Sequence, residues 1–203
     1  GIIYDTGRIK GIRKKSGMYS ITISLIKPIV RPEKGMSIAV NGACLTASVI
    51  RGSKQFDADM TAETASKTNL GQARTGMKVN IELPLTADKY MSGHIVQGHI
   101  DCTGKVDVLE KKGRNVIMRI RYPREFGKYL PEKGSVAIDG ISLTAYNINN
   151  ESFEVSVIPE TFDNTIIKGY KKEDRVNLEF DIIGKYVEKF LEAEKNKRIR
   201  KSK

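Results

Sequence analysis

The sequence predicts an all-β protein in which two similar small barrels follow one another and a single helix ends the chain. Three observations support this fold class. A ten-residue phrase at residues 38–47 recurs at residues 136–145, and Pro-Glu-Lys-Gly precedes both copies. Short segments with alternating polar and apolar residues occur in both halves, as is typical of half-buried strands. The long helical pattern at the end has no counterpart in the first half.

The repeat extends well beyond that phrase. Glu63-Thr64 recurs as Glu160-Thr161, and the opening residues 1–9 recur at residues 98–106. A period of about 97 residues is too long for a solenoid unit and suits a small domain. We therefore expect one barrel domain at residues 1–93, a second at 94–184, and a helix with a basic tail at 185–203.

The strand pattern is clearest at residues 18–26, where Ile21, Ile23 and Leu25 alternate with Ser and Thr, and it recurs at residues 116–122. Glycines and short polar turns separate the strands. Several short strands per repeat favour a closed barrel over an open sheet, because an open sheet leaves unpaired edges. The other expected strands are residues 38–40, 56–60, 79–83, 136–138, 153–157 and 176–180.

Helical patterns are fewer. Thr61 has the character of a helix cap before residues 65–70, and residues 160–166 are the counterpart in the second half. The long candidate is residues 185–201, in which four apolar residues fall on one stripe. This stripe would either bind another subunit or pack on its own chain, and the sequence does not choose between the two. Its members are Tyr186, Val187, Phe190 and Leu191.

The net charge of +11 could indicate a nucleic-acid partner. However, residues 195–203 carry six Lys or Arg and no acidic residue, so 11 − 6 leaves +5 for the rest of the chain. A basic terminal run is more often a solvated helix end than a polyanion-binding arm. No basic stripe interleaved with aromatics is present, and we expect no nucleic-acid partner.

The composition is otherwise that of a cytoplasmic protein with no membrane partner. No apolar run approaches the roughly 18 residues of a membrane helix, and no signal-peptide pattern opens the sequence. Cys44 and Cys102 are the only cysteines. Two cysteines without a CxxC motif or a Cys/His cluster predict neither a disulfide scaffold nor a metal site. We expect two reduced thiols.

The two halves differ where chemistry would need them to differ. Cys44 and Thr46 of the first half correspond to Ser142 and Thr144 of the second. Residues two apart on a strand share a face, so each pair should project two small polar groups in the same direction. These side chains are candidate binding or nucleophilic groups, although they could also simply fill a strand.

The residues just before these pairs have a simpler interpretation. Asn41-Gly42 and Asp139-Gly140 are typical of tight hairpin turns. We favour this structural role over a catalytic one for Asn41, Gly42 and Gly140.

The histidines mark the junction between the halves. His94 and His99 are the only two, and His99 stands where the first half has Ile2. Asp181 likewise replaces Pro84 of the first half. Histidine can carry a proton at neutral pH, and the neighbouring glycines allow a ligand to approach closely. We take His99 as a candidate catalytic or ligand-binding residue and His94 as structural.

Several phrases together resemble one enzyme family. They are residues 40–46, 63–64, 68–71, 93–101, 139–144 and 158–161, and they occur in the same order in riboflavin synthases of the two-barrel type. The resemblance runs from Gly1 to about Gly184. Beyond that point the helix and tail match the family in position rather than in sequence.

The resemblance implies two Greek-key barrels and a C-terminal helix that holds a homotrimer together. It implies a dismutation in which two molecules of 6,7-dimethyl-8-ribityllumazine give riboflavin and 5-amino-6-ribitylaminouracil, without metal, flavin cofactor or nucleotide. The site would lie between the N-terminal barrel of one subunit and the C-terminal barrel of its neighbour. Some relatives are enclosed by lumazine synthase, so an association with that enzyme is a further expectation.

The resemblance also implies residue roles. We expect His99 in proton transfer, Ser142 and Thr144 with Asp181 at the reacting ring, and Cys44 in orienting or adding to the substrate. The implied substrate contacts are Gly1, Ile2, Ile3, Ser37, Cys44, Leu45, Thr46, Asp59, Met60, Thr61, Ala62, Glu63, Thr64, Gly98, His99, Ile100, Lys133, Asp139, Ser142, Leu143, Thr144, Ile158, Pro159, Glu160, Thr161, Phe162 and Asp163.

Two further points bear on activity. Fluorescent relatives of the family keep both barrels and bind a lumazine or flavin without catalysis. Candidate catalytic residues are present in both halves here, which favours the enzyme. The family begins Met-Phe-Thr-Gly, and its phenylalanine matters for activity, whereas this sequence begins at Gly1. The preceding residues are either missing from the sequence or removed from the protein.

Overall fold

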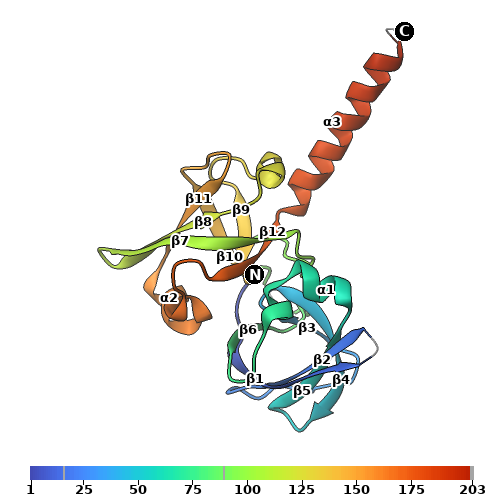
Figure 1. Ribbon diagram of the computed structural model, residues 1–203, viewed down its shortest axis with the longest axis vertical. Helices are drawn as coiled ribbons and strands as arrows, with labels where there is room; N and C mark the ends of the chain where they lie inside the picture. The colour runs from blue at the N-terminus through green and yellow to red at the C-terminus, as the bar shows by residue number, and fades with distance from the viewer. Residues whose placement is uncertain (16, 89, 202–203) are drawn as a thin grey trace.

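The computed structural model describes residues 1–15, 17–88 and 90–201. In this part of the chain, two closed barrels of six strands each follow one another, and the helix α3 (Ile182–Lys201) projects away from them (Figure 1). The N-terminus lies between the two barrels (Figure 1). The predicted all-β class, with tandem barrels and a C-terminal helix, is confirmed.

The two barrels have the same circular strand order. In the first it is β1-β2-β5-β4-β3-β6, and in the second the matching order is β7-β8-β11-β10-β9-β12, with every pair antiparallel. Closure leaves no free sheet edge. The first barrel comprises β1 (Asp5–Lys15), β2 (Met18–Ser24), β3 (Ser37–Val40), β4 (Ala43–Arg51), β5 (Gln55–Met60) and β6 (Lys78–Glu82). The second comprises β7 (Cys102–Lys112), β8 (Asn115–Arg121), β9 (Ser135–Ile138), β10 (Ile141–Tyr146), β11 (Ser152–Val157) and β12 (Arg175–Phe180).

Short helical segments connect the strands. Thr61 caps α1 (Ala62–Lys67) by accepting a hydrogen bond from the Thr64 amide, as predicted, and a 3-10 turn, η1 (Asn69–Gln72), follows. In the second half, α2 (Pro159–Asn164) and η3 (Ile166–Gly169) occupy the same place between strands. A further 3-10 turn, η2 (Arg124–Tyr129), lies between β8 and β9.

Each barrel has its own apolar core. Ile21 and Ile23 of β2 are fully buried, as the alternation predicted, and Met118 and Ile120 are their equivalents in β8. A phenylalanine from β5 or β11 is also completely buried in each core. Burial of side chains of this size contributes about 1.5–3 kcal/mol each. The two cores are separate clusters, so the barrels meet through other contacts.

Two hairpin turns form the centre of the contact between the barrels. Asn41 and Gly42 have φ angles of 46° and 75°, and Asp139 and Gly140 have 44° and 81°. Positive φ at both central residues is the geometry of a type I′ turn, so the turn interpretation is confirmed. The turns touch, because a Cβ added to Gly42 would lie 2.6 Å from the Gly140 nitrogen.

Buried asparagines surround these turns in a symmetric arrangement. The side-chain amide of Asn80 donates to the Asp139 backbone carbonyl at 3.0 Å, and the side-chain amide of Asn177 donates to the Asn41 backbone carbonyl at 2.8 Å. Buried polar groups that are fully hydrogen-bonded define one arrangement of the parts they join. The pair of turns therefore fixes the position of one barrel relative to the other.

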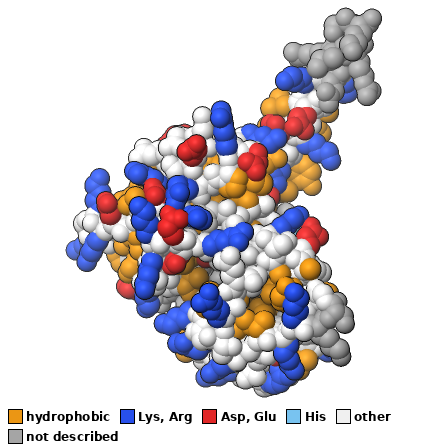
Figure 2. Space-filling view, viewed as in Figure 1, with side chains coloured by type: hydrophobic (Ala, Val, Ile, Leu, Met, Phe, Trp, Pro, Cys, Tyr) orange, Lys and Arg blue, Asp and Glu red, His pale blue; other side chains and the backbone are white. Residues whose placement is uncertain are grey.

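The helix α3 begins three residues before the predicted Lys185. Asp181 caps it by accepting a hydrogen bond from the Ile183 amide at 3.0 Å. The apolar stripe does not pack on its own chain, since its four residues are 51–71% exposed. Figure 2 shows orange, hydrophobic side chains exposed along the part of α3 that is drawn in colour. The end of the basic tail, residues 202 and 203, lies outside the described residues, and no described helix is both long and apolar enough to cross a membrane.

Candidate active site

The N-terminal barrel carries one open pocket beside β4. Cys44 and Thr46 are exposed on the outer face of this strand while Leu45 between them is buried, so the predicted shared face is confirmed. The cavity beside Cys44 has a volume of about 230 Å³. Its lining consists of Ala43, Cys44, Glu63, Thr64, Lys67, Thr68, Gly98, His99 and Ile100.

The C-terminal barrel carries an equivalent pocket beside β10. Ser142 and Thr144 point to the outer face of this strand, and the cavity there has a volume of about 670 Å³. In the lining of this pocket, the Lys133 ammonium lies over the Tyr146 ring, 5.1 Å from the ring centre. The lining consists of Gly93, Lys133, Ser135, Ser142, Leu143, Thr144, Tyr146, Ser156, Ile158 and Thr161. Among the described residues, none lines both this pocket and the one beside Cys44.

Each pocket is completed by the opening segment of the other repeat. The Cys44 amide donates to the Gly98 carbonyl at 2.9 Å, and the Ser142 amide donates to the Gly1 carbonyl at 3.0 Å. Gly98 has φ of 81°, and a Cβ there would lie 2.5 Å from the Cys44 Cβ. Only glycine therefore allows the segment that carries His99 to approach β4 this closely.

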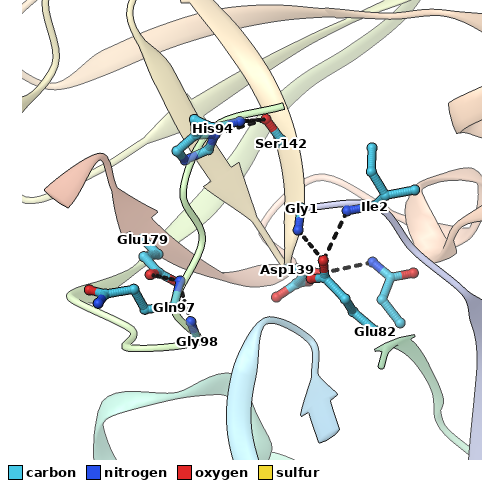
Figure 3. Close-up of polar contacts among 10 residues, drawn as sticks. Gly1, Ile2, Glu82, His94, Gln97, Gly98, Asp139, Ser142 and Glu179 are labelled. Atoms are coloured by element: carbon cyan, nitrogen blue, oxygen red, sulfur yellow. Dashed lines mark hydrogen bonds and ion pairs between the residues drawn. The ribbon is translucent and has the colours of Figure 1, made fainter. Parts of the chain in front are cut away.

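Two equivalent glutamates hold these crossing segments (Figure 3). Glu82 binds the N-terminal nitrogen of Gly1 and accepts the Ile2 amide at 3.1 Å. Glu179 accepts the Gln97 amide at 2.7 Å and the Gly98 amide at 2.9 Å. Hydrogen bonds to an ionised carboxylate are short and strong, so each segment is fixed where it passes the pocket.

Each nucleophile-type side chain has a histidine near it, but only His99 lines the same pocket as its partner, since His94 lines the cavity beside Gly1. His99 lies in the Cys44 pocket, as its repeat-breaking position suggested. His94 lies beside Ser142, with Nδ1 2.8 Å from the Ser142 Oγ (Figure 3). The sequence did not predict this contact, and the interpretation of His94 as structural stays untested.

The environment of His94 favours a neutral imidazole. Burial lowers the pKa of His94 below its ordinary value, and this outweighs the opposite effect of the nearby Asp181 carboxylate. The His94 backbone amide also points to the Ser142 Oγ, at 3.4 Å. A hydroxyl that accepts from this amide can donate its own proton to Nδ1. His94 Nε2 is buried and lacks a hydrogen-bond partner among the described residues.

Asp139 lies in the contact between the barrels, away from the lining of both pockets. It is fully buried, and its carboxylate accepts hydrogen bonds from the Asn69 amide, the Asn177 backbone and the Tyr170 hydroxyl, at 2.9, 2.8 and 2.6 Å. Burial raises the pKa of Asp139 to about 7 in spite of these donors. Its position indicates that it holds the turn before Ser142.

Four further groups of candidates have these places. Ser37 and Asp59 are exposed and pair with Thr46 across neighbouring strands, beside the first pocket. The side chains of Leu45 and Met60 are in the barrel core, so only their backbone could contact a ligand. Gly1, Ile2 and Ile3 line a third cavity of about 490 Å³ together with His94, and Pro159, Phe162 and Asp163 line a groove near the β7–β8 hairpin.

Cys44 and Cys102 are free thiols, as predicted. Among the described residues, no group of three or more His, Cys, Asp and Glu side chains is arranged to hold a metal ion.

Comparisons with known proteins agree with this arrangement. The lumazine binding domain family matches residues 1–84 and again residues 97–181. The riboflavin synthase of Actinobacillus pleuropneumoniae is 41% identical over 191 residues, which is 94% of this chain and 88% of that protein. The riboflavin synthase of Bacillus subtilis is 36% identical over 198 residues, covering 97% of this chain and 92% of that protein.

Solved structures with the same fold have bound ligands. The structure of LumP complexed with riboflavin superposes with a TM-score of 0.80 at 22% identity, covering 88% of this chain and 97% of that chain. LumP complexed with 6,7-dimethyl-8-(1'-D-ribityl) lumazine gives a TM-score of 0.77 at 22% identity, with the same coverage of both chains. Identity this low supports the fold alone. The two copies of the lumazine binding domain and the relatives that match nearly the whole chain show that this chain belongs to the riboflavin synthase family.

Proposed function

We propose that this chain is a riboflavin synthase, a transferase that converts two molecules of 6,7-dimethyl-8-ribityllumazine into riboflavin and 5-amino-6-ribitylaminouracil. One observation carries the proposal. Each barrel has a pocket with a small nucleophile-type side chain in its lining, and each of these side chains lies near a histidine. Cys44 shares its pocket with His99, and Ser142 contacts His94, which lines the neighbouring cavity. A reaction between two copies of one substrate needs two similar binding pockets with different chemical groups.

The residues suit the two tasks of this reaction. One lumazine must lose a proton from its acidic 7-methyl group, and the other must accept a nucleophile at C7. We assign proton transfer in the first pocket to His99, with Cys44 orienting or adding to the ring. In the second pocket, the neutral His94 can accept the Ser142 proton when Ser142 or a water adds at C7. The same substrate, or the charge that develops on it, would be contacted by Thr144, Lys133 and Asp181.

The two substrates must also meet. Because no described residue lines both pockets, we propose that the N-terminal barrel pocket of one subunit faces the C-terminal barrel pocket of a neighbour. The exposed apolar stripe of α3 is the element we assign to a homotrimer. Holding two reactants in register can contribute about 7–11 kcal/mol to lowering the barrier. A cytoplasmic location and an association with lumazine synthase remain predictions.

Incubation with 6,7-dimethyl-8-ribityllumazine alone tests the proposed function. We expect riboflavin absorbance to appear without any added cofactor, in equal amount to the uracil product. The protein is assayed both with Gly1 as its first residue and with Met-Phe-Thr placed before Gly1. Tight lumazine binding without riboflavin in either form would identify a non-catalytic binder. Sedimentation at several concentrations tests the trimer separately.

A further inference from the structure

The base of α3 is joined to the segment that carries His99. Asp101 follows His99 by two residues and begins the approach to β7, where its amide donates to the Leu178 carbonyl at 2.9 Å. One oxygen of the Asp101 carboxylate accepts the Phe180 amide at 2.8 Å and pairs with the Lys185 ammonium at 2.7 Å. The Asp101 and Lys185 side chains are only 16% and 22% exposed. A single carboxylate thus holds the end of β12 and the first turn of α3.

The same few residues include Asp181, which links the base of α3 to the surroundings of Ser142. Asp181 lies between Phe180 and Lys185, caps α3 and acts electrostatically on His94. His94 in turn contacts Ser142 at 2.8 Å. The base of α3 is therefore connected on one side to His99 of the N-terminal barrel pocket, and on the other to Ser142 of the C-terminal barrel pocket.

The rest of α3 has little contact with its own chain. Beyond the first turn, Lys128 of η2 pairs with Glu188 at 3.2 Å and Glu192 at 3.6 Å. The apolar stripe is exposed, and the helix extends away from both barrels (Figure 1). Within this chain, the apolar stripe is therefore connected to the barrels mainly through the base of the helix and the Lys128 ion pairs.

We propose that Asp101 and Lys185 are positioning residues that couple the placement of α3 to the geometry of both candidate pockets. The pair touches no reacting group itself. It acts through the backbone from Asp101 to His99 and through the cap residue Asp181. Because the reaction depends on the relative placement of two substrates, a displacement of about 1 Å in either segment can lower the rate by about a hundredfold.

Kinetics of matched variants test this inference, and this readout rests on the proposed function. Lys185→Met keeps most of the side-chain length and removes the ion pair. We expect kcat to fall about ten- to a hundredfold with KM within about twofold, because positioning affects the reacting geometry more than binding. Lys185→Arg should restore most of the activity. Lys128→Met removes an ion pair from the same helix without touching the His99 segment and should leave kcat unchanged.

Asp101→Asn provides a second variant. Its amide oxygen can still accept the Phe180 amide, so the fold is retained while the ion pair is lost. Its effect should equal that of Lys185→Met, and the double variant should be no worse than either single one, as for two members of one interaction. Unchanged thermal unfolding and an unchanged sedimentation coefficient would show that the fall in kcat does not come from a loss of folding or assembly.

The two histidines give a readout that does not need turnover. With [15N]histidine labelling, the chain has only the signals of His94 and His99. Lys185→Met and Asp101→Asn should shift the His99 ring signals, and Lys128→Met should not. The inference is wrong if His99 and kcat are unaffected in the first two variants, or if Lys128→Met reproduces their effects. Should the wild type form no riboflavin, the proposed function fails, and the His99 signals alone still decide this inference.

Discussion

The two barrels share the parts that join them and differ in the parts that line their pockets. Asn80 and Asn177 make the same bonds across the interface, and Glu82 and Glu179 hold the same crossing segments. The pockets differ in their nucleophile-type side chain, since the first has Cys44 where the second has Ser142, although Thr46 and Thr144 are identical.

This difference separates two requirements on one duplicated scaffold. The interface needs similar halves, because each turn fits against a turn of the same backbone geometry. The reaction needs unequal halves, because one substrate gives a four-carbon unit and the other receives it. Changes in the shared parts should therefore reduce stability, and changes in the differing parts should reduce activity.

The largest effect should come from breaking the contact between the turns. Gly42→Ala would place a Cβ 2.6 Å from the Gly140 backbone at a residue with φ of 75°. We expect the free energy of unfolding to fall by about 3 kcal/mol or more, because both backbone strain and a steric clash act there. Gly52→Ala is the control, since Gly52 also has positive φ, at 62°, but open space around it. It should cost only about 1 kcal/mol by urea denaturation. Equal costs for the two variants would argue against a tight contact between the barrels.

The next effect concerns the difference between Ser142 and Cys44. Ser142→Ala should lower kcat by about 10²–10⁴-fold, because it removes the hydroxyl whose proton His94 can accept. His94→Gln should reduce kcat in the same way, and the double variant should be little worse than either alone. Cys44→Ala should have a smaller effect if the thiol only orients the ring. A greater loss from Cys44→Ala than from Ser142→Ala, measured by riboflavin formation, would reverse the assignment of the two pockets.

Much of the fold could be predicted because its determinants are local. Alternation at Ile21 and Ile23, the capping Thr61 and the Asn-Gly and Asp-Gly turns each specify a short stretch of backbone. The equivalence of Cys44 and Ser142 also located both pockets. The pairing of His94 with Ser142 could not be predicted, because it depends on the path of the linker between the barrels. The sequence likewise gives no distance between Asp101 and Lys185, which meet only after the second barrel closes.

The burial of Asp139 is another example of a property set by tertiary contact. Its equivalent in the first half is Asn41, which has the same backbone conformation. Both side chains also accept the same kind of hydrogen bond, from the backbone amide of an asparagine in their own barrel. The resemblance to riboflavin synthases implied a substrate contact for Asp139. In the folded chain, its carboxylate accepts hydrogen bonds from Asn69, Asn177 and Tyr170.

The smallest effect should come from making the two turns alike. Asp139→Asn introduces the residue that the first turn already has, so the fold should be retained. Burial raises the pKa of Asp139 to about 7, well above the value of about 3.9 for an unfolded chain. Between these values the folded state binds more protons than the unfolded state, so wild-type stability is lost as the pH rises through about 7. Asp139→Asn lacks this loss, and its free energy of unfolding relative to wild type should increase by about 1 kcal/mol between pH 6 and pH 8. His94 contributes equally to both proteins and cancels in the difference. A difference that stays constant with pH would mean that the donors around Asp139 keep it ionised throughout this range.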